Sequence, residues 1–319
     1  MRVRRRRIER QPQRQRRLVR PVISVGNLSM GGTGKSPIVA AIARWLIDQG
    51  QRPAILSRGY ARADAVDGVV VVSDGRGIRS TLERSGDEPM MLARQVPGAI
   101  VCVSPDRHLA GTLAERELGA TVHVLDDGFQ HIELARDLDI LVTTIGEIPN
   151  GKVIPAGKLR EPIDAAARAQ VLLVSDATAG AAAAEAWTLG ISQSCGAARR
   201  LAAPIRVREP GSGNRDPEGA VLAVAGIASP ERFVRSLKET GWNVVDAMTF
   251  KDHHRYSSSD VAAIASRMQS SGATAVFTTD KDAVRFESHT PSFPLYRVPL
   301  IVEFDPSEPL FESIKAVLK

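Results

Sequence analysis

A glycine-rich segment that ends in lysine and serine is the part of the sequence best suited to chemistry. It reads GNLSMGGTGKSP from Gly26 and follows a short apolar run, Val22–Val25. Glycines let backbone N–H groups close around phosphate oxygens, and the N-terminus of a following helix adds about half a positive charge. In such a loop Lys35 reaches the β- and γ-phosphates and the Ser36 hydroxyl binds Mg²⁺. The predicted nucleotide-binding residues are Ser29, Met30, Gly31, Gly32, Thr33, Gly34, Lys35 and Ser36.

The loop departs from the strict GxxxxGK[ST] pattern at one position. That pattern has glycine where Ser29 stands, whereas the GGxGK[ST] core is intact. The structural alternative is a glycine-rich turn that arose by chance. A strand before the loop and a helix after it favour phosphate binding.

Carboxylates follow two other apolar runs. Asp126 and Asp127 come directly after Val122–Leu125, and Asp106 follows Ile100–Val103. Since the carboxyl ends of parallel strands meet at one edge of a sheet, we expect these side chains near the glycine loop. There Asp126 and Asp127 would organise Mg²⁺, and Asp106 could accept a proton from an acceptor hydroxyl. The structural alternatives are a simple Asp-Asp-Gly turn and a helix N-cap at Asp106.

Two adjacent histidines form the other candidate. His253 and His254 lie in the segment DHHRY, where they could bind metal or orient a catalytic acid. A solvated loop is the default interpretation of such a pair. The run TDKD at Thr279–Asp282 resembles a guanine-reading NKxD motif only superficially, because no asparagine precedes the lysine. The sequence therefore favours ATP over GTP.

Short apolar runs indicate the elements that hold these residues. Continuous runs of four or five residues are typical of strands buried on both faces, hence of a largely parallel sheet covered by helices. After the glycine loop, Ile38, Ile42, Trp45 and Leu46 share one helical face and Gly50 lies just beyond its end. The fold class is therefore α/β, with a P-loop NTPase-like parallel sheet. The predicted strands are Val22–Val25, Ala54–Ser57, Val69–Val72, Ile100–Val103, Val122–Leu125, Ile140–Thr143 and Val171–Val174.

A second, smaller α/β unit follows a break in the pattern. The segment Glu209–Gly219 holds two prolines and three glycines without an apolar residue, which predicts a loop or hinge. After it we expect strands at Val221–Val224 and Ala275–Thr278 and a strand that begins with Val244–Val245, with one helix begun by Ser229–Pro230 and another capped by Ser259–Asp260. The expected domains are a basic tail at 1–20, a nucleotide-binding domain at 21–205 and a domain at 206–319 that closes over the substrate.

The positive charge is concentrated at the N-terminus. Residues 1–20 hold ten arginines and one acid, so the other 299 residues carry a net charge of −3. Such a block is expected to be disordered until it meets a polyanion, either nucleic acid or anionic lipid; a plain solvated tail is the alternative. The chain has two distant cysteines and no apolar run long enough to span a bilayer, which favours the cytosol or a membrane face.

Nine sequence blocks together resemble the tetraacyldisaccharide 4′-kinase family of the lipid A pathway. They occur in the family's order between about residues 21 and 286. The blocks are GNLSMGGTGKSP, LSRGY, GDEP, SPDR, LDDGFQH, LREP, AGIASPERF, DHHRY and TDKDAV.

The resemblance implies a two-domain P-loop kinase. Such an enzyme uses ATP and Mg²⁺ to phosphorylate the 4′-hydroxyl of a tetraacylated glucosamine disaccharide 1-phosphate, at the cytoplasmic face of the inner membrane. The resemblance further implies that Asp106 and His253 act as a dyad at the acceptor hydroxyl, and that Arg160 binds nucleotide. It assigns the metal to Ser36, Asp126, Asp127 and Glu161.

This chain departs from the family at a few positions. Ser36 stands in place of threonine, Ala61 in place of glycine and Asp280 in place of glutamate, and none of these changes removes a catalytic group. The family's apolar N-terminal helix is replaced by the arginine-rich segment, for which we expect attachment to anionic lipid.

Two other function classes use some of the same features. A switch-type P-loop ATPase that controls a protein partner would need neither an acceptor base nor a lipid. A nucleic-acid binder would use the arginine-rich segment, but no aromatic platform accompanies it, so no nucleic-acid partner is expected.

Overall fold

The computed structural model describes residues 15–30, 34–59, 64, 67–148, 151–207, 217–287, 289 and 291–319. The chain forms two compact units, Met1–Arg199 with Val302–Lys319, and Arg200–Ile301. This division differs from the expected one because the C-terminus returns to the first unit. Leu310 and Ile314 of helix α10 (Glu308–Leu318) are fully buried there, and Phe311 stacks on Trp45 with ring centroids 4.5 Å apart.

A nine-stranded sheet forms the centre of the first unit, in the order β14-β8-β7-β6-β1-β5-β2-β4-β3. The strands from β8 to β4 pair in parallel, and β3 pairs antiparallel with β4 at the edge. All seven predicted strands are present, within two residues of their predicted ends, and the α/β class is confirmed. The strands are β1 Val22–Gly26, β2 Pro53–Ser57, β3 Val70–Asp74, β4 Ile100–Val103, β5 Val122–Asp126, β6 Leu138–Thr144, β7 Val171–Ser175, β8 Gln193–Leu201 and β14 Leu300–Asp305.

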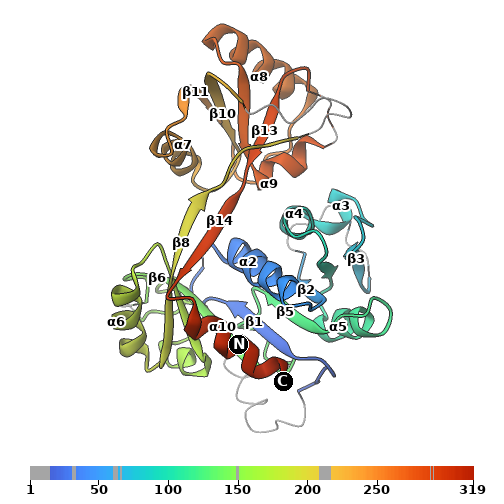
Figure 1. Ribbon diagram of the computed structural model, residues 1–319, viewed down its shortest axis with the longest axis vertical. Helices are drawn as coiled ribbons and strands as arrows, with labels where there is room; N and C mark the ends of the chain where they lie inside the picture. The colour runs from blue at the N-terminus through green and yellow to red at the C-terminus, as the bar shows by residue number, and fades with distance from the viewer. Residues whose placement is uncertain are drawn as a thin grey trace. The chain divides into compact units, whose positions relative to one another are not determined.

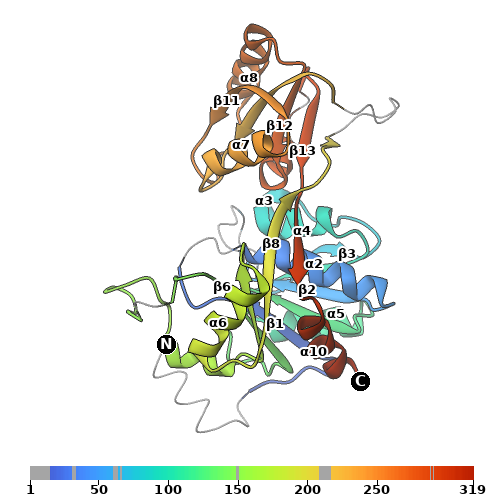
Figure 2. The same cartoon turned by 60° about the vertical axis from the view of Figure 1, so that its left-hand side comes forward.

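Helices cover both faces of this sheet (Figure 1, Figure 2). Helix α2 packs against α4 and, through the Trp45–Phe311 stack, against α10, so these three helices share one face. The connection from β1 to β2, which contains α2, runs one way along the sheet, and those from β4 to β5, β6 to β7 and β7 to β8 run the opposite way. Since such crossovers are right-handed, α5, η2 and α6 lie on the opposite face from α2. Their bounds are α2 Lys35–Asp48, α3 Leu82–Ser85, α4 Asp87–Gln95, α5 Arg107–Arg116, η2 Ile163–Arg168 and α6 Ala179–Leu189.

The second unit has a five-stranded sheet in the order β11-β10-β12-β13-β9. Helix α8 begins two residues earlier than predicted, because Ser257 rather than Ser259 is its N-cap and forms a capping box with Asp260. The predicted loop at 209–219 lies largely outside the described residues. The elements are β9 Ile205–Arg206, β10 Ala220–Ala225, α7 Pro230–Glu239, β11 Asn243–Thr249, α8 Ser258–Ser271, β12 Ala275–Thr279, α9 Asp280–Ala283, η3 Val284–Phe286 and β13 Leu295–Val298.

The end of the basic N-terminal segment is held along helix α5. Leu18 is buried, and its side chain fills the space beside Gly111, where a Cβ atom would come within 2.3 Å of Leu18. The Arg16 amide donates to the Glu133 carbonyl at 2.9 Å, and the Arg20 amide donates to the Glu115 carboxylate at 2.7 Å. Residues 15–20 are therefore ordered, unlike the tail expected at 1–20, of which residues 1–14 lie outside the described chain.

Candidate active site

The glycine loop and the Asp-Asp pair lie at the same edge of the sheet. Strands β1 and β5 are parallel neighbours, with Val25 beside Asp126. The Lys35 Nζ atom, at the start of α2, lies 3.4 Å from Asp127 Oδ1, and Arg160 Nη1 donates to Asp127 Oδ2 at 2.7 Å. The structure thus brings together three residues that were predicted to bind nucleotide or metal.

The two neighbouring carboxylates have opposite electrostatic environments. Burial, with the charges of Glu88 and Asp127, raises the pKa of Asp126 to about 7. Burial also disfavours ionisation of Asp127, but Lys35 and Arg160 outweigh it, so the pKa of Asp127 is lowered. Asp127 has the left-handed backbone angle φ 54°, which turns its side chain out of the strand direction.

These carboxylates fit a magnesium ion. The Asp126 side chain is buried, and Ser57 Oγ donates to it only at 3.4 Å, so a hard cation would compensate its charge. Within the described part of the chain, no group of three or more His, Cys, Asp or Glu residues is arranged to hold a metal. Mg²⁺ needs no such cage, because it is commonly held by one or two carboxylates together with substrate phosphates.

Glu161, the third predicted metal ligand, is engaged elsewhere. Its buried carboxylate pairs with Arg168 Nη2 at 3.0 Å, and the Arg168 guanidinium lies 4.5 Å from the centre of the Phe129 ring. Metal binding by Glu161 would require this pair to open, and the assignment stays a prediction.

The glycine loop is anchored at both ends of its described part. The buried Ser29 hydroxyl donates to Glu147, and the Met30 amide donates to the Lys158 carbonyl at 2.8 Å. These contacts explain why serine can replace the usual glycine, since its side chain has its own partner. Gly34 has the left-handed angle φ 78°, which glycine adopts without steric cost, and Ser36 lies in the first turn of α2. Gly31, Gly32 and Thr33 lie outside the described residues.

Asp106 occupies the N-cap position that the sequence analysis left open. Its carboxylate accepts the Leu109 amide hydrogen at 3.1 Å and two hydrogen bonds from the Arg16 guanidinium, at 2.7 and 2.8 Å. The hydrogen bonds from Arg16 lower the pKa of Asp106. In this state the carboxylate is a weak proton acceptor, and its predicted role as a base requires Arg16 to leave.

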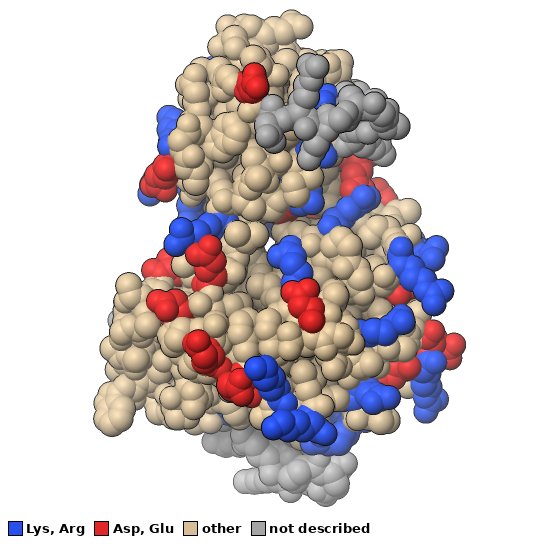
Figure 3. Space-filling model, in the orientation of Figure 1, with Lys and Arg blue, Asp and Glu red and all other residues tan. Residues whose placement is uncertain are grey.

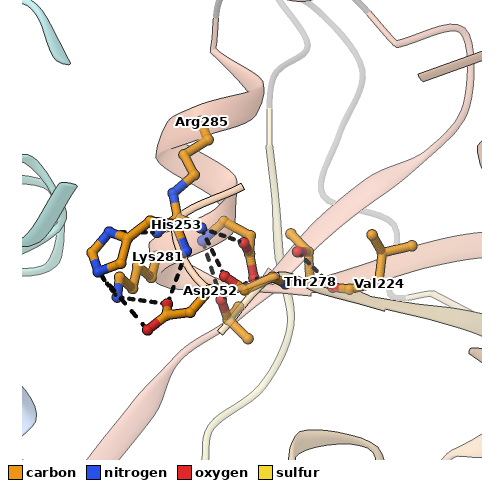
Figure 4. Close-up of polar contacts among 9 residues, drawn as sticks. Val224, Asp252, His253, Thr278, Lys281 and Arg285 are labelled. Atoms are coloured by element: carbon orange, nitrogen blue, oxygen red, sulfur yellow. Dashed lines mark hydrogen bonds and ion pairs between the residues drawn. The ribbon is translucent and has the colours of Figure 1, made fainter. Parts of the chain in front are cut away.

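His253, in the second unit, lies in an exposed loop, as the default interpretation expects, and its side chain belongs to a polar cluster (Figure 4). Its backbone is left-handed, with φ 61°, and its Nε2 atom lies 3.2 Å from Lys281 Nζ. On the other side of the ring, Nδ1 lies 3.5 Å from Arg285 Nη2. Arg285 is itself held by the buried Asp282 at 2.9 Å. His254 points elsewhere: its ring stacks on Phe250 and bonds to Asp260.

Sequence reasoning missed other charged residues of the site. Glu88, at the start of α4, lies near enough to Asp126 to raise its pKa. Arg199, on β8, reaches the end of the glycine loop, where its Nη1 atom lies 3.0 Å from the position of a Cβ atom on Gly34. Asp176 holds that guanidinium in place. The GDEP block could have pointed to Glu88, whereas no local pattern marks Arg199.

Comparison with known proteins identifies close relatives of the whole chain. A family model described as tetraacyldisaccharide-1-P 4′-kinase matches residues 1–319. A tetraacyldisaccharide 4′-kinase of Pelobacter propionicus is 41% identical over 315 residues, covering 95% of this chain and 85% of that protein. One of Geobacter sulfurreducens is 40% identical over 302 residues, covering 92% and 82%.

A solved structure matches as well. The crystal structure of an "apo" form of LpxK from Aquifex aeolicus, in complex with ATP, has a TM-score of 0.77 and 29% sequence identity. The match covers 96% of this chain and 90% of that one.

Proposed function

Because the chain belongs to the tetraacyldisaccharide-1-P 4′-kinase family, we propose that Lys35, Asp126 and Asp127 carry its phosphoryl transfer. The chain is an ATP-dependent kinase of the 4′-hydroxyl of a tetraacylated disaccharide 1-phosphate in lipid A biosynthesis, as its sequence blocks predicted. Neither its relatives nor the solved structure supports the alternative of a protein-controlling switch ATPase.

The observation that supports this site best is the contact of Lys35 and Arg160 with Asp127 at the edge where β1 and β5 end. Phosphoryl transfer needs mainly positioning and neutralisation of charge, so cations and carboxylates suffice without a covalent nucleophile. When bound, Mg²⁺ neutralises charge on the phosphates, and Asp126, Asp127 and Ser36 would hold it. Lys35 would turn from Asp127 to the phosphates, and Arg160 would keep Asp127 in position.

The transfer itself is tested directly. The full chain is incubated with γ-labelled ATP and a detergent-dispersed tetraacylated disaccharide 1-phosphate, and the lipid is then extracted. We expect label in the lipid, dependent on Mg²⁺. Label found only in inorganic phosphate would contradict the proposal.

The proton acceptor is tested by separating Asp106 from its partner. If Asp106 accepts the proton of the sugar hydroxyl, Asp106→Ala lowers kcat by about 10²- to 10⁴-fold, while ATP affinity is kept. Arg16→Ala releases the carboxylate and is expected to leave kcat unchanged or to raise it, because the pKa of Asp106 then returns toward its ordinary value.

Loss of the N-cap at Asp106 also costs stability of about 1 kcal/mol, so both variants are compared by thermal unfolding. Equal loss of kcat in Arg16→Ala and Asp106→Ala would show that the ion pair is structural and that the base lies elsewhere. The pairing of Asp106 with His253 in a dyad stays a prediction.

We propose that the protein works on the cytoplasmic face of the inner membrane, as its acylated substrate requires. None of the helices in the described part of the chain is long and apolar enough to cross a membrane. Acidic and basic side chains are intermixed on the face shown in Figure 3. In the sequence, positive charge is concentrated in the N-terminal arginines.

These arginines are expected to attach the protein to anionic lipid. Each basic residue near such a surface contributes up to about 1 kcal/mol, screened by salt. Vesicles with and without anionic lipid are sedimented with the full chain and with a chain lacking residues 1–14, which keeps the contacts of Arg16 and Leu18. We expect binding only to the anionic vesicles, lost in high salt and on truncation. Equal binding of both chains would place the contact elsewhere.

A further inference from the structure

Arg107 is a buried cation that has no ion pair with any residue the structure describes. It begins helix α5, directly beyond the end of β4, and only 4% of its surface is exposed. Its Nη1 atom makes two long hydrogen bonds, both 3.4 Å, to the carbonyls of Ser104 and Pro105. Among the residues that the structure describes, Nε has no acceptor and no carboxylate forms an ion pair with Arg107. A buried charge that lacks a counter-charge and an acceptor for one of its donors lowers the stability of the fold, so we expect a ligand to bind it.

Arg107 lies at the nucleotide edge of the sheet, because β1, β5, β2 and β4 are parallel neighbours and Arg107 follows the carboxyl end of β4. Burial lowers its pKa to about 10, and the charges of Asp126 and Asp127 act on it in the opposite direction. Arg107 therefore stays charged at neutral pH and lies within electrostatic reach of the two predicted metal ligands.

A second polar atom without a partner lies close by. The Nε2 atom of His131 is buried and makes no hydrogen bond within the described part of the chain. Its pKa is lowered to about 4, by burial and then by the charge of Arg107. The His131 ring is thus neutral at pH 7 and adds no charge. The two unsatisfied groups, one cationic and one neutral, suit an anion with several oxygens.

We propose that Arg107 is a catalytic residue that donates hydrogen bonds to the phosphoryl group in transfer. The inference rests on the proposed function, since the anion that Arg107 binds is then the terminal phosphate of ATP. Lys35 contacts Asp127 at 3.4 Å, and the charges of Asp126 and Asp127 also act on Arg107, so both cations lie near this pair of carboxylates.

The chemistry needs no proton from Arg107. The bond from the γ-phosphorus to the bridging oxygen of ATP breaks as the bond to the sugar oxygen forms, and the hydroxyl proton goes to the acceptor base. ADP leaves with the bridging oxygen. The guanidinium keeps its protons and offers a planar set of donors to the phosphoryl oxygens as charge redistributes over them.

The test uses the full chain with Mg²⁺, ATP and the detergent-dispersed lipid acceptor. Arg107→Ala and Arg107→Lys are compared with Arg116→Ala, which removes an exposed arginine from the last turn of the same helix. We measure kcat, the Kd for ATP and the thermal unfolding midpoint. Turnover of Arg107→Ala is also measured with added guanidinium chloride, against sodium chloride at equal ionic strength.

We expect kcat of Arg107→Ala to fall by about 10²- to 10³-fold, with the Kd for ATP within about threefold of the original value. Guanidinium should restore part of the lost rate and sodium chloride none. Arg107→Lys should recover the charge but not the planar set of donors, and so stay well below the original rate. Arg116→Ala should behave like the unchanged protein.

Turnover of Arg107→Ala within about threefold of the original, or a loss explained by weaker ATP binding or unfolding, would overturn the proposal. So would the absence of rescue by guanidinium. Lys35→Ala is assayed alongside to keep the two proposals apart. If Lys35→Ala is inactive while Arg107→Ala is active, only the role of Arg107 fails; if Lys35→Ala is active, the proposed site fails.

Discussion

Lys35→Ala is expected to lower turnover by about 10³-fold while the protein stays folded. Lys35 lies at the first residue of α2, and its ammonium is 3.4 Å from Asp127. The helix is held by Ile38, Ile42 and Leu46, which are buried and unaffected by the change. In the proposed site the lysine contributes charge at the phosphates rather than packing, so its loss should appear in kcat and in ATP affinity.

Turnover is measured with γ-labelled ATP and the lipid acceptor, and folding by thermal unfolding. Lys35→Arg tests whether positive charge alone is enough; we expect it to recover little, because the guanidinium is larger and planar. Lys315→Ala is the matched control, since it removes a half-exposed lysine that pairs with Glu312 on the same helix, α10. A Lys35→Ala protein with near original turnover would refute the site.

The strands of the fold could be predicted because burial on both faces leaves a local signature. β1, β5 and β7 are continuous runs of buried, largely apolar residues, so four or five neighbouring residues suffice to identify each. β8 was missed because its sequence, QSCGAARRL, mixes exposed and buried positions without an apolar run. The return of α10 to the first unit was missed because the Trp45–Phe311 stack joins residues far apart in the sequence.

The residues of the candidate site also divide into those that the local sequence marks and those that only tertiary contacts reveal. Lys35, Asp126 and Asp127 were found because each adjoins a strand end or a helix start, where the local sequence already shows the chemistry. The bond between Arg16 and Asp106 spans 90 residues, so no spacing predicts it. Arg199 beside Gly34 and Arg107 near Asp126 are likewise tertiary contacts. The sequence therefore predicts the groups that we propose to bind nucleotide and metal, and the structure adds the cations around them.

Asp126→Asn is expected to stabilise the metal-free protein while lowering turnover by about 10²-fold or more, through loss of a metal ligand. Burial raises the pKa of Asp126 from 3.8 to about 7, so between these pH values the folded protein holds a proton that the unfolded chain has released. The contribution of Asp126 to the free energy of unfolding therefore falls as pH rises from about 4 to 7. Above pH 7 the full cost of the buried charge remains, on the order of 2–4 kcal/mol.

Asparagine carries no charge and avoids this cost, so the variant should exceed the original protein in stability by an amount that grows between pH 5 and pH 8. Urea unfolding in the presence of EDTA measures the difference at both pH values. His131, whose pKa is lowered to about 4, changes stability in the opposite sense over part of this range, but it does so equally in both proteins. In samples with Mg²⁺ in place of EDTA, the difference in the free energy of unfolding between the two proteins should be smaller, because the cation stabilises only the protein with the original carboxylate. A variant that is equally destabilised at both pH values would show that Asp126 is held by structural hydrogen bonds, and that its burial does not serve to bind a metal ion.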